Sequence, residues 1–294
     1  LNSDDNNVTS NNANENTENG IRLSQGSDNN VLTDNTASDN GNDGILATVS
    51  NGNDLISNTL SSNDDDGINI VAAEGTNLTD NTAVSNSDDG IILASSSANN
   101  LTDNEASLNS NEGIELTAAT SNDEGFGLTD PSRDNNITDN RATSNGDNGI
   151  ELDNFANNNT VSENIASDNA NGIELDQGAN DNKIVGNDAS QNNDNGILLT
   201  SSSGNNPSNG NNLTDNTANN NDVNGIWIEF GNNNVLTGNT ANNNGDNGIY
   251  LGTQPLAQAD GNILIDNTAN DNGGSGSIVV GGFSGIYLSQ ADDN

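Results

Sequence analysis

Short stretches in which apolar and polar residues alternate return along the whole chain in two recurring segments. One is Gly-Ile-x-Leu or a close variant, with its glycine at Gly20, Gly44, Gly67, Gly90, Gly113, Gly149, Gly172, Gly196, Gly225, Gly248 and Gly285. The other is typified by Leu-Thr-Asp-Asn-Thr-Ala, with its apolar lead at Val8, Leu32, Leu55, Leu78, Leu101, Ile137, Val161, Ile184, Leu213, Leu236 and Leu264. Alternation with a period of two predicts short strands, and the Asn, Asp, Gly and Ser residues between them predict tight turns.

The repeat period of 23 or 24 residues decides the fold class. A unit this small cannot bury its own apolar face, so it must stack on its neighbours, as in a solenoid. No segment shows the 3.6-residue spacing of a helix. We therefore expect an all-β protein, a single parallel β-helix over residues 1–294 with about eleven coils.

Two unbroken columns of asparagine support this interpretation. Side chains stacked from coil to coil can donate amide hydrogen bonds to one another, and Asn tolerates the left-handed backbone of a sharp corner. The first column is Asn11, Asn35, Asn58, Asn81, Asn104, Asn140, Asn164, Asn187, Asn216, Asn239 and Asn267. The second, five residues later, is Asn16, Asn40, Asn63, Asn86, Asn109, Asn145, Asn169, Asn192, Asn221, Asn244 and Asn272.

The pattern N-x-[ILV]-x-x-N followed by N-x-x-x-G-I-x-L resembles the repeat of NosD-like proteins and of the wider pectate-lyase-like superfamily. This resemblance covers nearly the whole chain and implies a right-handed parallel β-helix. It implies less about function, because the same scaffold carries lyases, hydrolases, epimerases, adhesins, phage spikes and non-catalytic accessory proteins.

Composition removes several functional classes. The chain has 44 acidic and four basic residues, a formal net charge of -40, and this argues against nucleic acid as a partner. Cys and His are absent, so thiol chemistry and the commonest general base are excluded, and only oxygen ligands remain for metals. We expect no cofactor, although Ca²⁺ could bind weakly at acidic turns such as 64–66, 88–89 and 147–148. The acidic excess is typical of salt-adapted proteins, as in a halophilic archaeon or its virus.

Repetition fails at four longer connections, near residues 117–135, 200–211, 252–261 and 273–284. The first three follow a Gly-Ile-x-Leu strand directly, so we expect them to emerge at one corner of the coil. Loops held on a rigid scaffold often carry function, although exposed turns also tolerate insertions cheaply.

The x position of Gly-Ile-x-Leu should face outward, because the flanking Ile and Leu face the core. In coil order this column contains three acids, a leucine and then three of the chain's seven aromatic residues. The predicted site, for a glycan or a partner, is Glu115, Glu151, Glu174, Leu198, Trp227, Tyr250 and Tyr287.

Three functions stay open for this column. The first, which we predict, is a non-catalytic extracellular protein, at a cell or virion surface, whose glycan-facing groove binds a polysaccharide or glycoprotein. The second is self-assembly into a filament or stalk, through the same face or end to end. The third is a polysaccharide lyase or glycoside hydrolase, because acids on neighbouring coils lie about 5 Å apart, close to the spacing of a retaining glycosidase pair. We assign no catalytic residue, and no apolar run approaches the roughly 20 residues of a membrane span.

Overall fold

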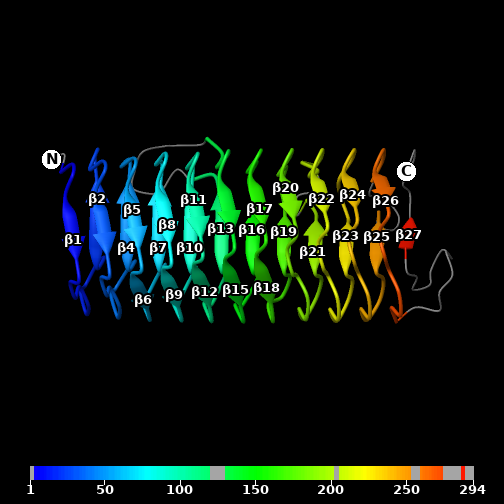
Figure 1. The fold of residues 1–294 in the computed structure, drawn as a ribbon, viewed down its shortest axis with the longest axis horizontal. Coiled ribbons are helices and arrows are strands. Elements are labelled where there is room, and N and C mark those ends of the chain that lie inside the picture. Colours follow the sequence, from blue (N-terminus) through cyan, green and yellow to red (C-terminus); the bar gives the residue numbers. More distant parts are fainter. Residues whose placement is uncertain (1–2, 120–129, 202–204, 253–258, 274–285, 289–294) are drawn as a thin grey trace. The chain divides into compact units, whose positions relative to one another are not determined.

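The computed structural model describes residues 3–119, 130–201, 205–252, 259–273 and 286–288 (Figure 1). The chain divides into two compact units, Leu1–Gly146 (unit 1) and Asp147–Asn294 (unit 2). In each unit every coil contributes to parallel sheets, here named A, B and C, and the described residues contain strands and turns but no helix. The predicted all-β parallel β-helix is confirmed.

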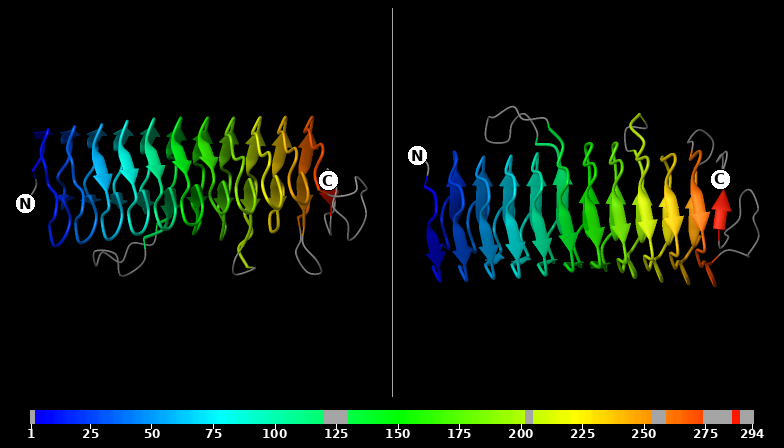
Figure 2. Two further views of the ribbon diagram at one scale, coloured as in Figure 1. Left: turned by 90° about the horizontal axis from the view of Figure 1, so that it is seen from below. Right: turned by 45° about the horizontal axis from the view of Figure 1, so that its top comes forward.

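In unit 1 three parallel sheets run along the coils, and Figure 2 shows them from two further sides. Sheet A contains β1 (Asn7–Thr9), β3 (Val31–Thr33), β5 (Asp54–Ile56), β8 (Asn77–Thr79), β11 (Asn100–Thr102) and β14 (Asn136–Thr138). Sheet B contains β6 (Thr59–Ser61), β9 (Thr82–Val84), β12 (Glu105–Ser107) and β15 (Arg141–Thr143). Sheet C contains β2 (Ile21–Ser24), β4 (Ile45–Thr48), β7 (Ile68–Val71), β10 (Ile91–Ala94) and β13 (Ile114–Thr117).

Unit 2 repeats this plan. Its sheet A contains β17 (Thr160–Ser162), β20 (Lys183–Val185), β22 (Asn212–Thr214), β24 (Val235–Thr237) and β26 (Ile263–Ile265). Its sheet C contains β16 (Ile150–Leu152), β19 (Ile173–Leu175), β21 (Ile197–Leu199), β23 (Ile226–Ile228), β25 (Ile249–Leu251) and β27 (Ile286–Leu288). The third side begins with β18 (Ile165–Ser167) and continues as single parallel bridges through Asp188, Thr217, Thr240 and Thr268.

The core is a narrow aliphatic column. The strand register stacks aliphatic side chains of neighbouring coils on one another. Ile68 pairs with Ile91 and Ile70 with Leu93, and all four are fully buried. Burying such a side chain contributes roughly 1.5–3 kcal/mol relative to exposure. Repeated small contributions, rather than a wide aromatic core, therefore hold each unit together.

Both predicted asparagine ladders are present. Asn58 donates its backbone N–H and its side-chain Nδ2 to Oδ1 of Asn81, at 3.0 and 2.9 Å, and Nδ2 also donates to the Leu32 carbonyl at 2.9 Å. One amide thus joins three coils. The structure adds a third ladder that the sequence analysis missed, containing Asn6, Asn30, Asn53, Asn99 and Asn135 in unit 1 and Asn159, Asn182, Asn211, Asn234 and Asn262 in unit 2.

Close packing requires the glycine before eight of the sheet C strands, at Gly20, Gly44, Gly67, Gly90, Gly149, Gly172, Gly196 and Gly225. At Gly67 an added Cβ would lie 2.6 Å from the carbonyl oxygen of Gly90 and 2.8 Å from Cβ of Ala83. Both neighbours belong to the tightly stacked coil, so neither can move away without breaking the stack.

Candidate functional site

The outward column of sheet C in unit 2 brings five of the predicted residues into one row. Glu151 pairs in register with Glu174, which pairs with Leu198, and the row continues through Trp227 to Tyr250. Neighbouring positions lie about 4.8 Å apart, the spacing of paired strands. The acids and aromatics are half-buried and Leu198 is buried, so the row forms a packed surface that presents its outer edge to solvent.

A second row runs beside the first and was not predicted. It lies just after the strand ends, two residues further along each coil, at Asp153, Asp176, Thr200, Glu229 and Gly252, of which Asp176, Thr200 and Gly252 are buried. Gly-Ile-Glu-Leu-Asp occurs twice, at residues 149–153 and 172–176, and that repetition was the available signal. Two neighbouring coils thus carry four carboxylates on one face.

Burial changes the proton affinity of this carboxylate group. It raises the pKa of Glu174 to about 7, helped by the negative charges of Asp176 and Asp147 and opposed by hydrogen bonds from Asn148 and Asn171. The Asn171 side chain holds the carboxylate in place by donating Nδ2 to Oε2 of Glu174 at 2.9 Å. At neutral pH Glu174 is therefore close to half protonated.

Asp153 adds to the same local field. Its pKa is raised, mainly by burial and secondly by the charge of Asp176. Its Oδ1 atom is buried and has no hydrogen-bond partner among the residues that the structure describes. The other carboxylate oxygen, Oδ2, accepts from Nδ2 of Asn154, so only one oxygen of Asp153 lacks a donor there.

The aromatic half of the row is a stacked pair. The rings of Trp227 and Tyr250 lie 5.5 Å apart between centroids, with 3° between their planes. Trp227 also donates Nε1–H to the carbonyl of Gly252 at 3.2 Å, and Thr200 donates its hydroxyl to Oε2 of Glu229 at 2.8 Å. The indole is thus fixed across both rows, and stacking covers one face of each ring.

The two remaining predicted residues also lie in sheet C strands. Glu115 lies in β13 of unit 1, where it pairs in register with Ile92. Tyr287 lies in β27 of unit 2, in register with Tyr250, and its side chain is outside the described part.

The longer connections follow the ends of β13, β21 and β25, at Thr117, Leu199 and Leu251. Residues 120–129, 202–204 and 253–258 of these connections lie outside the described residues, as does all of 273–284 except Gly273. A wall formed by these loops beside the row stays a prediction.

Three carboxylates of unit 1 come together where the acidic turns of two neighbouring coils meet. Asp43, Asp65 and Asp66 each place one oxygen within 4.8 Å of the other two. An oxygen-only set suits a hard cation such as Ca²⁺. Weak Ca²⁺ binding at residues 64–66 stays a prediction.

Three solved structures of carbohydrate-active proteins share the fold. The A-module of a mannuronan C-5 epimerase from Azotobacter vinelandii matches with a TM-score of 0.69 and 14% identity, over 94% of this chain and 77% of its own. The catalytic domain of an alpha-1,3-glucanase, solved with nigerose, gives 0.63 and 11%, over 97% and 64%. An alginate lyase from Paenibacillus gives 0.58 and 11%, over 98% and 99%. At these identities the likeness establishes the fold alone.

The amino-acid sequence was also compared with curated proteins and with protein families. A search of curated protein sequences gave no match. Within the described residues, no helix has the length and apolar character needed to cross a membrane. The family described as "Right handed beta helix region" matches residues 1–124 and 117–213. Since these matches cover well over half of the sequence, the chain belongs to the right-handed β-helix family.

Proposed function

We propose that the outward face of sheet C in unit 2 binds a polysaccharide and hydrolyses its glycosidic bonds. The observation that carries this proposal is Glu174, a carboxyl group with a pKa of about 7 in register beside Glu151. A glycosidase needs one carboxyl that is still protonated at neutral pH and a second that is ionised.

The geometry suits a retaining reaction. Glu174 would donate its proton to the glycosidic oxygen as the bond to the anomeric carbon breaks, and the Glu151 carboxylate would attack that carbon. Water, deprotonated by Glu174, would then cleave the glycosyl ester and restore both groups. Neighbouring strand positions lie about 4.8 Å apart, close to the roughly 5–5.5 Å between the carboxyl groups of retaining enzymes.

The rest of the face would bind the sugar chain. Leu198, Trp227 and Tyr250 offer apolar surface to the C–H faces of sugar rings, and the carboxylates accept hydrogen bonds from hydroxyl groups. The three similar structures, an epimerase, a glucanase and a lyase of carbohydrates, support this class of substrate. We place the protein outside the cell, where such polymers occur.

The test is Glu174→Gln, which keeps the shape of the side chain and removes the proton. We expect hydrolysis of α-1,3-glucan or alginate, measured as new reducing ends, to fall by roughly 10²–10⁴-fold. Binding, measured by Trp227 emission, should persist. Wild-type hydrolysis should also decline above pH 7 as Glu174 loses its proton. Glu163→Gln, an exposed acid of unit 2 away from this face, is the matched control.

Two outcomes would replace this proposal. A saturable shift of Trp227 emission with a polysaccharide, without new reducing ends, would indicate a non-catalytic binder. An emission shift on protein dilution alone would indicate that the face packs against another copy. The stacked Trp227–Tyr250 pair favours the second alternative, because stacking leaves only one face of each ring for a sugar.

A further inference from the structure

One column of turn residues after sheet C follows a strict rule in unit 2. In each coil the side-chain Oδ1 accepts a hydrogen bond from the backbone N–H of the matching residue in the next coil. Distances of 2.7–2.8 Å join Asn157 to Asn180, Asn180 to Asn209, Asn209 to Asn232, and Asn232 to Asp260. The Oδ1 atoms of these Asn side chains are therefore used in hydrogen bonds between neighbouring coils.

Unit 1 begins in the same way and then departs from the rule. The backbone N–H of Asp28 donates to Oδ1 of Asp4 at 3.0 Å, and that of Asn51 donates to Oδ1 of Asp28 at 2.6 Å. The backbone N–H of Glu74 then donates to Oδ1 of Asn51 at 2.8 Å. The next amide, that of Ser97, instead donates to the carbonyl of Ala73 at 3.1 Å. The series of side-chain to backbone hydrogen bonds therefore ends at Glu74.

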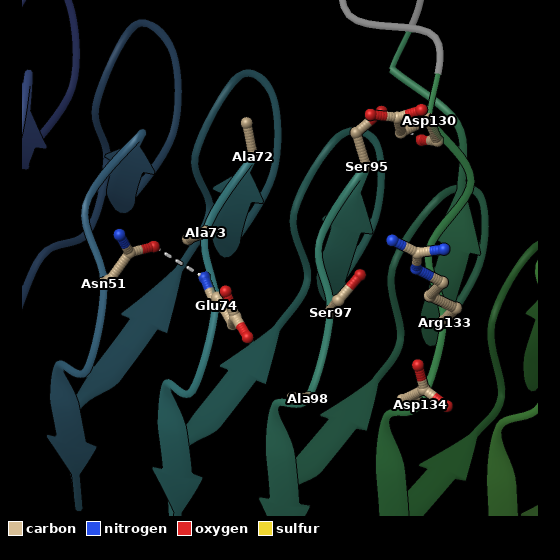
Figure 3. A pocket seen from close by; sticks show the side chains of 10 residues that line it. All are labelled: Asn51, Ala72, Ala73, Glu74, Ser95, Ser97, Ala98, Asp130, Arg133 and Asp134. Atoms are coloured by element: carbon tan, nitrogen blue, oxygen red, sulfur yellow. Dashed lines mark hydrogen bonds between the residues drawn. The ribbon is translucent and has the colours of Figure 1, made fainter.

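Three side chains on successive coils are released by this break. Parallel bridges pair Glu74 with Ser97 and Ser97 with Arg133, so the three lie side by side, as Figure 3 shows. Among the residues that the structure describes, no hydrogen bond or ion pair holds their side-chain polar atoms. A carboxylate, a hydroxyl and a guanidinium thus stand in one row, without partners in the described part of the chain.

These groups line a groove of about 420 Å³. Alanines at 72, 73 and 98 leave the space open, and Asn51 anchors one wall through the backbone of Glu74. Ser95 fixes the opposite rim by donating its hydroxyl to the carbonyl of Asp130. The volume lies within the range of roughly 300–1,000 Å³ typical of small-molecule sites.

The chemistry of the lining restricts the ligand. Three carboxylates, of Glu74, Asp130 and Asp134, face one guanidinium, so an anionic ligand is repelled. The lining keeps a net negative charge, but a bare cation would leave the guanidinium donors of Arg133 without an acceptor, whereas hydroxyl groups can use these donors and the carboxylates together. The lining contains no aromatic or large aliphatic side chain, which argues against a lipid or a flat aromatic ring. A ligand that both donates and accepts at many points, without net charge, fits best.

We propose that this groove of unit 1 binds a neutral sugar unit. Its hydroxyl groups accept from the guanidinium of Arg133, donate to the carboxylate of Glu74, and exchange either kind of hydrogen bond with Ser97. The proposal is independent of the sheet face in unit 2, since it rests on other residues and requires no catalysis.

The experiment titrates the full chain with maltose, cellobiose and nigerose, and with galacturonic acid as the anionic comparison, using saturation-transfer NMR and calorimetry. We expect at least one neutral disaccharide to bind and galacturonic acid to bind more weakly or not at all. Arg133→Gln and Glu74→Gln should each weaken that binding by roughly tenfold or more, since each removes a charged hydrogen-bonding group.

Matched controls come from the same unit. Arg141→Gln and Glu105→Gln change the same two residue types, paired in register on sheet B, and should leave affinity unchanged. Arg133 and Glu74 are exposed, so both groove variants should fold, which circular dichroism checks.

Three results would each overturn the proposal: no neutral disaccharide binds, galacturonic acid binds more tightly, or binding survives Arg133→Gln. A sugar that shifts Trp227 emission and ignores Arg133→Gln would be bound by unit 2 instead.

Discussion

The two units build the same corner of the coil with different side chains. At the residue before the glycine of sheet C, each backbone N–H donates to a side-chain oxygen of the preceding coil. Asp89 donates to Oδ1 of Asp66 at 3.0 Å in unit 1, and Asn224 to Oδ1 of Asn195 at 3.2 Å in unit 2. Unit 1 forms an acid ladder of Asp43, Asp66, Asp89 and Glu112, and unit 2 an amide ladder of Asn148, Asn171, Asn195, Asn224 and Asn247.

The difference lies in the second donor. Asn224 also donates Nδ2 to Oδ1 of Asn195 at 2.9 Å, whereas an ionised carboxylate has no proton to offer its neighbour. The pKa of Asp66 is raised well above its usual range by burial and then by the charge of Asp89. That of Asp89 is raised by burial and then by Glu115. The same backbone geometry is thus hydrogen-bonded throughout in one unit and strained by stacked like charges in the other.

The largest effect should come from breaking the amide ladder with Asn195→Ala. It leaves the N–H and Nδ2 of Asn224 without their acceptor and removes the side-chain donor to Oδ1 of Asn171, which keeps only the backbone N–H of residue 195. We expect roughly 3 kcal/mol of destabilisation, measured by urea unfolding followed through Trp227. Asn193→Ala, an exposed neighbour, is the control, and equal unfolding midpoints for the two variants would contradict the ladder's role.

A smaller, opposite effect should follow from making the acid ladder resemble the amide ladder. Asp66→Asn with Asp89→Asn supplies the missing donors and removes two buried charges, so we expect roughly 2 kcal/mol of stabilisation at pH 7. Hydrogen exchange of the unit 1 amides, in buffer with EDTA, measures it. Asp64→Asn with Asp103→Asn removes the same charge from exposed positions and should do much less.

This gain should depend on pH. A carboxyl whose pKa is raised in the folded state stabilises the protein fully below its unfolded pKa of about 3.9 and loses this as pH rises through the folded pKa. Wild-type unit 1 should therefore become more protected from exchange between pH 7 and pH 4. The advantage of the double variant should shrink over the same range, and a constant advantage would show that charge is not its cause.

The smallest effect concerns the third asparagine ladder, which is broken in unit 1 by Thr76. The Oγ1 atom of Thr76 is buried without a hydrogen-bond partner among the described residues. Thr76→Asn should restore the acceptor for the neighbouring coil and stabilise unit 1 by about 1 kcal/mol. Exchange rates near Asn53 measure this, with the outward Thr79→Asn as the control. Slower exchange in the control alone would contradict it.

The fold was predictable from the sequence because each coil of a solenoid makes the same contacts, so the residues that make them recur at a fixed period. Asn81 and Gly67 could be placed from periodicity alone, since every coil presents the same residue there. The third ladder was missed because Thr76 interrupts its pattern in unit 1. That burial is the main cause of the raised pKa of Glu174 could not be predicted, because alternation marks the outward column only as facing solvent.

The groove was missed for a related reason. A search for repeats finds residues that recur in every coil. Glu74 and Arg133 were not found because they lie where the side-chain to backbone hydrogen bond between neighbouring coils is missing. The salt-adapted setting, self-assembly and a glycan partner stay predictions. Unfolding in molar and in low salt would test the first of them.

The amide ladder of unit 2 also bears on chemical ageing. All five of its asparagines precede a glycine, the sequence at which Asn loses its amide most readily, because glycine leaves the next backbone nitrogen unhindered. In the folded coil those nitrogens are occupied, as where Gly196 donates to the carbonyl of Asn224. Each unfolding event exposes them, and every amide lost leaves an acid in the ladder. Damage of this kind would gradually give unit 2 the side chains that unit 1 already carries.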